Sequence, residues 1–592
     1  MALADMSVNT YNFTNYSYTL ENLLRYNVTI AKDHEISALA GYQEFYYQSS
    51  WLSTEKKGLA DEYATIPSGA TTLISTEGSK NDNASRSWFG RLNYAYKSRY
   101  LFEGNLRYDG TSKFHPKYRW GLFPSAAVAW RITEENFMKW SRKYLDNLKI
   151  RVSYGQLGNS AASGDYDYQS NYAFTAGYSL NNVEQIAINA AKIANINMGW
   201  ERTNMFNVGL DLAAFGNRLN FQADVYNRVT KGILYVPTLI PSMGNKTSAS
   251  MNLANVQNRG VELTVGWKDH IKDFHYSISA NMAFNKNRVL KYQGSLKQGW
   301  VTDKDGNRKW VSNLSDVSNG STRRVLEGHE MYVYYMMPTY KGSGKHFNAD
   351  GTVDINGGPV DGMIRTEDDM KWLQAMMEAG YQFSPGNTVG KNNIWYGDYI
   401  YADTNQDKIY GNSYDNEFIN KSTTPRVNYG IQVSLQYKGF DFYMNWAGSA
   451  GFMLYWAPNG GYNSSNLTHG FGINKEIAYN HYFYDPEDPN NARTNIHGKY
   501  ERLTVGNAGT QNNVASTRFL HKGDFLKLKN LVLGYTLPIK RVANFRMPKI
   551  RVFLSGDNLL LFTKFPGQDP ELGANPTYSS VRQFSAGLNV TF

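Results

Sequence analysis

The sequence predicts an all-β protein: a transmembrane antiparallel β-barrel with long extracellular loops and short periplasmic turns. Three observations lead to this fold class. Apolar and polar residues alternate over many segments, the connections between segments are alternately short and long, and aromatic residues are abundant despite a low mean hydropathy. Aromatic residues make up 15% of the 592 residues, with 44 Tyr and 13 Trp, and the mean hydropathy is −0.52. Tyr and Trp suit membrane interfaces, where one end of the side chain is apolar and the other hydrated.

The alternation identifies the strands. In residues 274–284, one face carries only apolar residues and the other carries mainly polar ones. The apolar face holds Phe274, Tyr276, Ile278, Ala280, Met282 and Phe284, and the opposite face includes His275, Ser277, Ser279 and Asn281. Side chains of a strand point alternately to its two faces, so this period of two predicts a strand with one apolar face. Roughly 15 such strands are predicted, the last ending at Phe592.

The lengths of the connections favour a membrane barrel over a soluble sandwich, since both have strands with one apolar face. Short turns are predicted at 97–99, 216–217, near 269–270 and at 438–439. Long connections are predicted at 157–198, 293–423 and 457–516. Outer-membrane barrels sort their connections in this way, with short turns on the periplasmic side and long loops outside. Two short helices are expected, one over 133–143 with Thr133 as its N-cap and one within 365–380.

Several classes of function are excluded or disfavoured. The chain has no cysteine, so it has neither disulfides nor thiolate metal ligands. The formal net charge of +10 is spread thinly, which argues against nucleic acid as a partner. The match to S-x-x-K at Ser53–Lys56 lacks the accompanying motifs of the enzymes that use it. We therefore expect no enzymatic activity and no cofactor.

Many phrases resemble one family in order along the chain. They include "FGRLNYAYKSRYLFEGNLRYDGTSKF", "ITEENFMK", "LKIRVSYGQLGN", "WERTNMFNVGLDL", "YKGFDFYMNWAGSAG", "FLKLKNLVLGYTLP" and "LSGDNLLLFTKFPGQDPEL". The family is that of the SusC/RagA-type TonB-dependent transporters of Bacteroidetes. The resemblance implies an outer-membrane location and the import of glycans or peptides, energised through the TonB complex. It also implies a SusD-like lipoprotein as an extracellular lid and a role for Phe592 in the signal for membrane insertion.

The sequence also departs from this family. Related barrels have about 22 strands and a plugged lumen, whereas roughly 15 strands are predicted here. Nothing in the sequence resembles a plug, a TonB box or the small N-terminal domain common in the family. Residues 1–592 are therefore expected to be the C-terminal part of such a barrel, and whether a companion chain supplies the remaining strands stays open.

Aromatic residues in the long connections are candidates for stacking on a glycan or peptide substrate. They are Tyr334, Tyr335, Tyr340, Trp395, Tyr396, Trp456 and Tyr462. Alternatively, these side chains pack the loops against one another. Charged residues on the lumen-facing polar side, such as Arg91, Glu103, Arg107 and Asp224, are expected to form a solvated or plug-facing network that need not contact substrate.

A weak calcium site is a further possibility in the stretch "DTNQDK". Asp403, Asn405 and Asp407 have the first three spacings of a calcium-binding loop. Lys408, however, stands where such a loop has glycine, and Tyr414 stands where it has glutamate. A turn rich in Asp and Asn is the alternative.

Two other classes of function remain. The first is an outer-membrane barrel that does not transport and serves as a surface scaffold or adhesin. The second is a soluble glycan-binding β protein.

Overall fold

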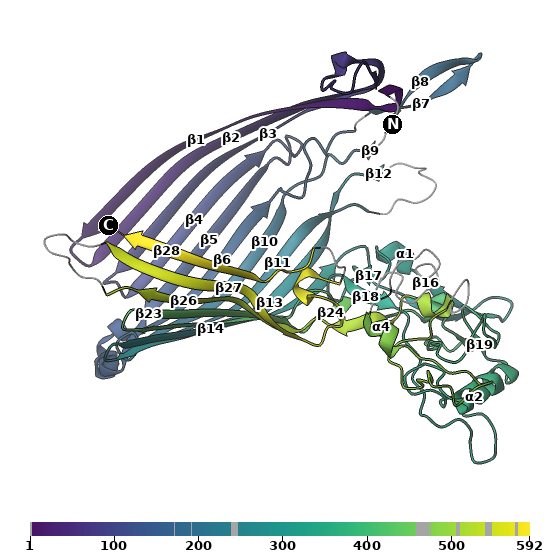
Figure 1. The fold of residues 1–592 in the computed structure, drawn as a ribbon. Helices are drawn as coiled ribbons and strands as arrows, with labels where there is room; N and C mark the ends of the chain where they lie inside the picture. Colours follow the sequence, from purple (N-terminus) through teal and green to yellow (C-terminus); the bar gives the residue numbers. More distant parts are fainter. Residues whose placement is uncertain are drawn as a thin grey trace. The chain divides into compact units, whose positions relative to one another are not determined.

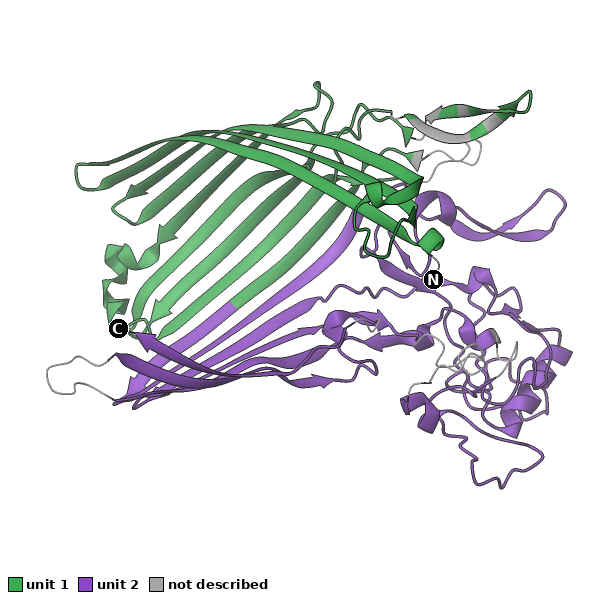
Figure 2. Cartoon of the chain, turned by 45° about the horizontal axis from the view of Figure 1, so that its top comes forward, with its two compact units in different colours: residues 1–263 green, residues 264–592 purple. Residues whose placement is uncertain are grey.

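The structure is a computed structural model that describes residues 3–170, 172–190, 192–237, 247–457, 473, 475–504, 510–538, 548–574 and 578–591. Two of the predicted functional residues, Tyr462 and Phe592, lie outside this part of the chain. The chain divides into two compact units, residues 1–263 and 264–592, which have different colours in Figure 2. Within the described part, no helix combines the length and apolar character needed to span a membrane.

Long antiparallel strands that pair in chain order build the first unit (Figure 1). They are β1 (Ser7–Ile30), β2 (His34–Leu59), β3 (Ala70–Tyr96), β4 (Tyr100–Thr111), β5 (Trp120–Arg131), β6 (Leu145–Asn159), β10 (Glu201–Ala214), β11 (Leu219–Tyr235) and β13 (Met251–Ile271), which continues into the second unit. Smaller elements are η1 (Leu3–Asp5), η2 (Pro67–Gly69), η3 (Ile132–Glu134), η4 (Asn136–Lys143), the hairpin of β7 (Tyr172–Leu180) and β8 (Val183–Ala190), and the parallel pair β9 (Lys192–Ile193) and β12 (Thr247–Ser248).

The second unit holds the remaining long strands. They are β14 (Phe274–Lys291), β22 (Val427–Tyr437), β23 (Phe440–Ala450), β26 (Phe525–Thr536), β27 (Lys549–Thr563) and β28 (Gln583–Thr591), with the short helix η9 (Pro570–Leu572) before β28. The long strands form a fifteen-stranded antiparallel sheet, so the predicted number of strands is confirmed.

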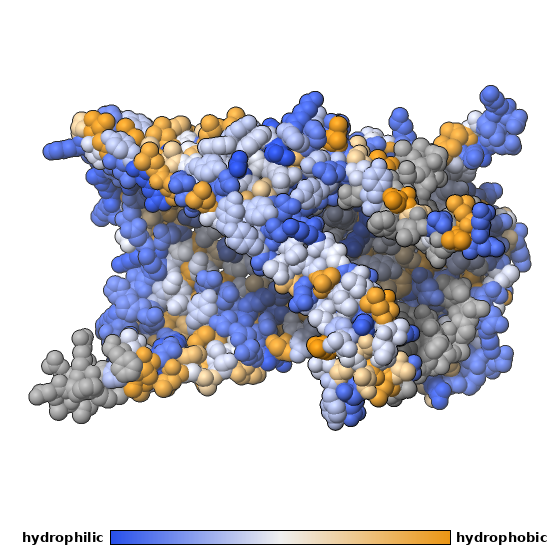
Figure 3. All heavy atoms as spheres, turned by 90° about the horizontal axis from the view of Figure 1, so that it is seen from above, coloured by the Kyte–Doolittle hydropathy of each residue, from blue (hydrophilic) through white to orange (hydrophobic). Residues whose placement is uncertain are grey.

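The register of the strands keeps each face of the sheet uniform. Between β14 and β22, Ile278 lies opposite Val433 and Ser279 lies opposite Gln432. Because the side-chain period is two, this register places apolar residues next to apolar ones along one face and polar residues along the other. Apolar side chains such as Ile278 and Leu106 remain exposed, and Figure 3 shows hydrophobic side chains at the surface. The predicted alternation is therefore present in three dimensions.

The connections follow the predicted lengths. Short turns at 97–99 and 438–439 join neighbouring strands, and residues with positive φ, such as Lys97 (φ 52°) and Ser98 (φ 50°), make these reversals tight. The turn expected near 269–270 is wrong by a few residues: β13 continues to Ile271 and the turn is at 272–273. Alternation alone could not locate this turn, because polar residues occupy both the strand end and the turn itself.

The helix expected over 133–143 is two short 3-10 helices, η3 and η4. Thr133 is not an N-cap. It is buried, and its hydroxyl oxygen accepts a hydrogen bond from the backbone N–H of Leu148 (3.3 Å). A Thr that caps a helix and a Thr that supports the next strand look the same in sequence.

The described parts of residues 292–426 and 451–524, here called the loop module, contain small elements and a core of their own. The elements are β15 (Gln298–Thr302), β16 (Arg308–Ser312), α1 (Leu314–Val317), β17 (Arg323–Arg324), β18 (Val333–Met336), α2 (Glu367–Glu378), β19 (Gln382–Phe383), β20 (Ile409–Tyr410), η6 (Ser413–Asp415), β21 (Glu417–Phe418), β24 (Met453–Tyr455), α4 (Lys475–Asn480), η7 (Thr510–Asn513), η8 (Thr517–Phe519) and β25 (Leu520–Lys522). The helix expected within 365–380 is α2, whose N-terminus has a capping box formed by Thr366 and Asp369.

A buried carboxylate joins distant segments of the loop module. Asp398 is fully buried and accepts hydrogen bonds from Arg502 Nε (2.7 Å), Asn512 Nδ2 (2.8 Å) and Gln511 Nε2 (2.5 Å). Burial raises the pKa of Asp398, while Arg502 acts in the opposite direction. These contacts link residues more than a hundred positions apart, so the two long connections fold as one structure.

Candidate substrate-binding site

The polar face of the first unit carries a network of charges. Arg151 on β6 forms ion pairs with Asp211 (3.0 Å) and Asp224 (2.7 Å), and Lys149 also pairs with Asp211 (2.8 Å). On β3 and β4, Arg91 donates to Asn105 (2.8 Å), and Asn105 donates to Glu103 (2.8 Å). The predicted residues make polar contacts on this face but do not form one network: Asp224 pairs with Arg151, which the sequence analysis did not single out, whereas Arg107 pairs with Asp109 (3.0 Å).

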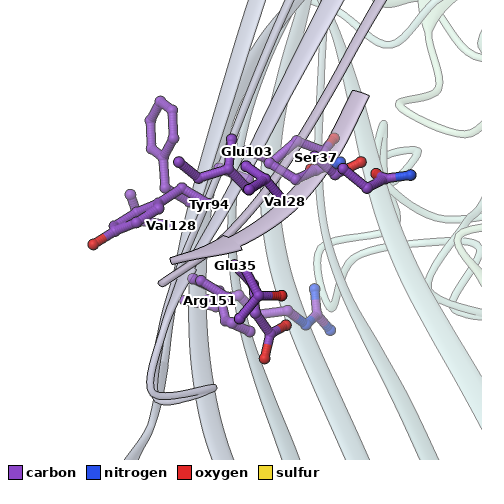
Figure 4. A pocket seen from close by; sticks show the side chains of 16 residues that line it. Val28, Glu35, Ser37, Tyr94, Glu103, Val128 and Arg151 are labelled. Carbon is purple, nitrogen blue, oxygen red and sulfur yellow. The ribbon is translucent and has the colours of Figure 1, made fainter. Parts of the chain in front are cut away.

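A hollow of about 620 Å³ in the first unit is lined from both faces of the strands, by Glu103 and Arg151 of the polar face and by Tyr94 and Phe102 of the apolar face. Figure 4 shows its lining, in which Tyr94 and Arg151 extend to opposite sides of the strands. Small side chains, Ala95, Ala127 and Ala129, form part of the lining. The long strands of the fifteen-stranded sheet are here called the strand wall. Because the lining residues all lie on β1 to β6 and these alanines leave space beside Arg151, the hollow belongs to the strand wall itself.

A second pocket, of about 580 Å³, lies at the loop ends of β22, β23 and β26 and is here called the strand-end pocket. Ser449 on β23 and Phe525 on β26 contribute from the strands, and Ser449 lies on the polar face of β23, opposite Asn428. The full lining is Thr322, Arg323, Tyr334, Thr423, Pro425, Ser449, Phe452, Leu454, Tyr455, Phe525, Pro570, Glu571, Leu572, Gly573 and Ala574. The pocket therefore combines the polar face of the sheet with loop residues that carry rings and charges.

Two polar side chains of the strand-end pocket already bond to other groups of the protein. The buried hydroxyl of Tyr334 donates to the carbonyl oxygen of Met453 (3.1 Å) and accepts from the N–H of Tyr455 (3.1 Å), and burial raises the pKa of Tyr334 to about 12. Glu571 is held by Lys527 (3.2 Å) and by Lys529. Both groups shape the pocket and have little capacity left for a ligand.

Arg323 differs from these residues. It is exposed, and within the described part of the chain its guanidinium makes no hydrogen bond or ion pair. A guanidinium offers five N–H donors in a planar fork. Apolar rings beside one free cation suit a ligand with both apolar surface and hydrogen-bond acceptors, which describes oligosaccharides and peptides alike.

A third cavity, the outer cleft, lies within the loop module and has a volume of about 610 Å³. It is lined by Lys391, Trp395, Tyr396, Tyr479, His481, Tyr482, Phe483, Tyr484, Asp485, Arg493, Asn495, Arg502 and Leu503. Trp395 and Tyr484 both meet Tyr396 at steep angles, with centroid distances of 5.2 and 5.1 Å. Since neither contact is a parallel stack, the rings do not cover one another face to face.

The predicted aromatic residues fall into three groups. Tyr334 lines the strand-end pocket, and Trp395 and Tyr396 line the outer cleft. Tyr335, Tyr340 and Trp456 line none of the three cavities: Tyr335 packs on Phe418, Tyr340 stacks on Trp372, and Trp456 packs on Phe565.

The sequence analysis did not predict two further parts of the cavity linings: Tyr455 in the strand-end pocket and the run Tyr479–Asp485 in the outer cleft. The letters "YNHYFYD" of that run carry the signal, since five rings in seven residues, that of His481 included, indicate a ring-lined surface outside any strand pattern.

The stretch proposed for calcium folds as a turn closed on itself. Asp403 accepts from the N–H groups of Asp407 (3.2 Å) and Lys408 (2.9 Å), and Asp407 accepts from the N–H of Ile409 (2.8 Å). Lys408 has φ 69°, the left-handed conformation that explains why glycine suits this position. Among the described residues, no group of three or more His, Cys, Asp or Glu side chains is arranged to hold a metal. Calcium at Asp403, Asn405 and Asp407 stays a prediction.

The fold and the two faces of its strands define the class of protein. Antiparallel strands with one apolar and one polar face, joined alternately by short turns and long loops, are the architecture of outer-membrane β-barrel proteins. Residues 3–366 match the profile of the family described as TonB dependent receptor-like, beta-barrel. The chain belongs to this family and is located in the outer membrane.

The relatives that the chain resembles are TonB-dependent receptors, SusC among them. It is 27% identical to the TonB-dependent receptor P3 of Formosa agariphila, a match that covers 98% of this chain and 53% of that protein. It is 26% identical to the TonB-dependent receptor SusC of Bacteroides thetaiotaomicron, over 98% of this chain and 50% of that one.

A solved structure of the RagAB peptide transporter superposes with a TM-score of 0.73 at 20% identity, covering 99% of this chain and 56% of the other, which shows the fold. The chain thus spans about half the length of the curated relatives that it matches. These relatives are receptors and transporters rather than enzymes.

Proposed function

We propose that this protein takes part in the import of oligosaccharides or peptides across the outer membrane, energised through TonB and assisted by a SusD-like lipoprotein that covers the loop side. The observation that carries the proposal is the strand-end pocket. It joins the polar face of the strands to the loop module and presents the free guanidinium of Arg323 beside aromatic side chains. A solute that enters from the loops would meet this pocket at the ends of the strands.

The relatives support the proposal. The superposed structure is titled a peptide transporter, and SusC is named a TonB-dependent receptor. Both peptides and oligosaccharides have acceptor groups for Arg323 and surfaces that rings can contact, so the pocket accommodates either class.

The test is made at the genomic locus, because TonB acts on an N-terminal box and plug in this type of transporter. A strain without the gene is compared with its parent for uptake of a labelled oligosaccharide mixture and a labelled peptide mixture. We expect the loss of uptake of one of the two mixtures, and the same loss in a TonB-deficient parent. Co-purification of a lipoprotein with the tagged receptor tests the lid.

A pair of arginine variants tests the pocket. Arg323→Ala should reduce uptake at low substrate concentration more than at saturation, because it removes a binding contact. Arg308→Ala is the matched control, since Arg308 lies over the ring of Trp300 in the β15–β16 hairpin and lines none of the three cavities. Normal uptake of both mixtures without the gene, with a loss of surface attachment instead, would favour the scaffold or adhesin.

A further inference from the structure

The helix η4, on the short-turn side of the first unit, carries large aromatic side chains that the fold leaves uncovered. Phe137 is 60% exposed, Trp140 76% and Tyr144, directly after the helix, 55%. Phe215 in the adjacent short turn is exposed as well, and its N–H donates to the carbonyl oxygen of Tyr144 (2.8 Å). None of these residues lines any of the three cavities.

The 3-10 geometry gathers the rings on one edge. Residues three apart in a 3-10 helix lie above one another, so Phe137 and Trp140 share an edge. Met138 and Ser141 point elsewhere: Ser141 is buried, and its hydroxyl donates to the carbonyl oxygen of Met138 (2.8 Å). The helix thus has a side that packs on the protein and an aromatic side that does not.

Buried polar contacts hold the start of the helix in place. Glu135, directly before η4, is buried and accepts hydrogen bonds from Arg99 (2.9 Å), the hydroxyl of Tyr100 (2.5 Å) and the indole N–H of Trp130 (3.0 Å). Arg131 donates to Glu134 (3.2 Å) and to the carbonyl oxygen of Ser98 (3.1 Å). These contacts fix η4 to the ends of β4 and β5, so its orientation is set by the strand wall.

The aromatic edge continues the apolar face of the strands. On β5, Leu122, Val128 and Trp130 lie on one face and are all exposed. The ring of Phe137 meets Trp130 edge to face at a centroid distance of 6.5 Å. Since the apolar face of an outer-membrane barrel contacts lipid, the rings of η4 extend the lipid-contacting surface beyond the end of β5.

Basic residues accompany the rings. The helix has Lys139, Arg142 and Lys143 but no acidic residue. Arg142 lies 3.6 Å from Glu134, the ammonium of Lys143 is 5.4 Å from the ring centroid of Tyr144, and within the described part of the chain Lys139 makes no ion pair. Lysine beside exposed aromatic residues is the composition that binds anionic phospholipid at a membrane surface.

We propose that η4 is a membrane-surface anchor. Phe137, Trp140 and Tyr144 insert into the interfacial layer of the leaflet on the short-turn side, and Lys139 and Lys143 bind the phosphates of anionic phospholipids. The anchor fixes the depth of the strand wall in the bilayer at one edge. It depends on the outer-membrane location and not on which solute is transported.

The first experiment uses the absence of native cysteine. Trp140→Cys is labelled with a polarity-sensitive dye in the full chain, folded in vesicles of phosphatidylethanolamine and phosphatidylglycerol in a three-to-one ratio. Asp273→Cys, in the short turn between β13 and β14, is the control. We expect blue-shifted emission at 140 with quenching by a nitroxide near the lipid headgroup, and water-like emission at 273. Adding Lys139→Glu and Lys143→Glu should lessen the quenching in these vesicles but not in phosphatidylcholine.

The second experiment needs no refolding. A photoreactive phenylalanine analogue replaces Trp140 in cells that make the protein, and the cross-linked products are analysed by mass spectrometry. Phospholipid adducts are expected. A cross-link to another protein as the main product, or water-like emission at 140 in folded protein, would overturn the proposal.

Discussion

Large apolar side chains are exposed in the strand wall and buried in the loop module. In the first unit, Leu106 on β4 is 50% exposed and Val128 on β5 is 51% exposed, although both lie in the middle of regular strands. In the loop module, Trp372 and Met376 of α2 are fully buried. The wall has long, regular elements with little buried, whereas the module has short, irregular elements around a dense core.

This difference shows that the two regions are built for different solvents. An apolar face that no other layer of the protein covers is stable only against hydrocarbon, where backbone hydrogen bonds must be satisfied within the sheet. The loop module instead buries its rings as a water-soluble domain does, where the hydrophobic effect stabilises the core. The following predictions test whether each region follows the rules of its own solvent.

The largest effect is expected from emptying the core of the loop module. Trp372 stacks on Tyr340 at 5.4 Å, and its indole N–H donates to the carbonyl oxygen of Asp354 (2.7 Å). Trp372→Ala should cost about 3–5 kcal/mol of the stability of the module, because a large buried ring leaves a cavity. Hydrogen exchange of peptides from 333–423 would measure this loss.

The matched control is Trp310→Ala. Trp310 lies in the β15–β16 hairpin, where it meets Trp300 edge to face, and it is not part of the core cluster of the module. We expect a much smaller change in exchange. Equal losses for the two variants would mean that the module has no core of its own in solution.

The next effect concerns the wall. Ile278→Arg should destabilise the folded protein in vesicles by up to about 2–4 kcal/mol, the cost of arginine on the lipid face at mid-membrane, because the guanidinium must be desolvated. Ser279→Arg, one residue further on the opposite face, should be tolerated. Denaturant titration in phospholipid vesicles gives both free energies of unfolding, and similar values would contradict the assignment of the two faces.

The sequence predicts the wall well and the loop module poorly, for one physical reason. Which face of a strand is apolar depends only on the alternation of adjacent residues. The apolar face from Phe274 to Phe284 could therefore be assigned without reference to other parts of the chain. The buried contacts of Asp398 involve Arg502, Gln511 and Asn512, which lie 104 to 114 positions away. No local period indicates such contacts, and for the same reason the partners of Tyr340 and Trp456 could not be foreseen.

A smaller effect, which depends on pH, is expected on the stability of the polar turn that contains Asp403. The carboxylate of Asp415 accepts from the N–H groups of Thr404 (2.7 Å), Gly411 (3.0 Å) and Asn412 (3.0 Å). Burial, and to a lesser degree the neighbouring Asp403, raises the pKa of Asp415 from 3.8 to about 6.

A carboxyl whose pKa is raised by folding favours the folded state below its unfolded pKa, and this contribution is lost as the pH rises through the folded pKa. Between pH 8 and pH 5 the turn should therefore gain roughly 1.4 kcal/mol. Hydrogen exchange of the amide of Thr404 would report the gain, after correction for the intrinsic dependence of exchange on pH. Asp415→Asn should remove the pH dependence, and if the slope is unchanged in that variant another group is responsible.

The smallest change in stability is expected at the start of α2, where a capping box, a local motif that can be recognised from sequence, holds the first turn. The hydroxyl oxygen of Thr366 accepts from the N–H of Asp369 (3.1 Å), and the carboxylate of Asp369 accepts from the N–H of Thr366 (2.9 Å). Thr366→Ala removes one of the two bonds and should cost about 1 kcal/mol. Thr388→Ala is the control, since Thr388 is exposed and outside any helix. Exchange of the amides in the first turn of α2 should quicken in the first variant alone. If both variants leave that turn unchanged, the buried residues of α2 hold it without its cap.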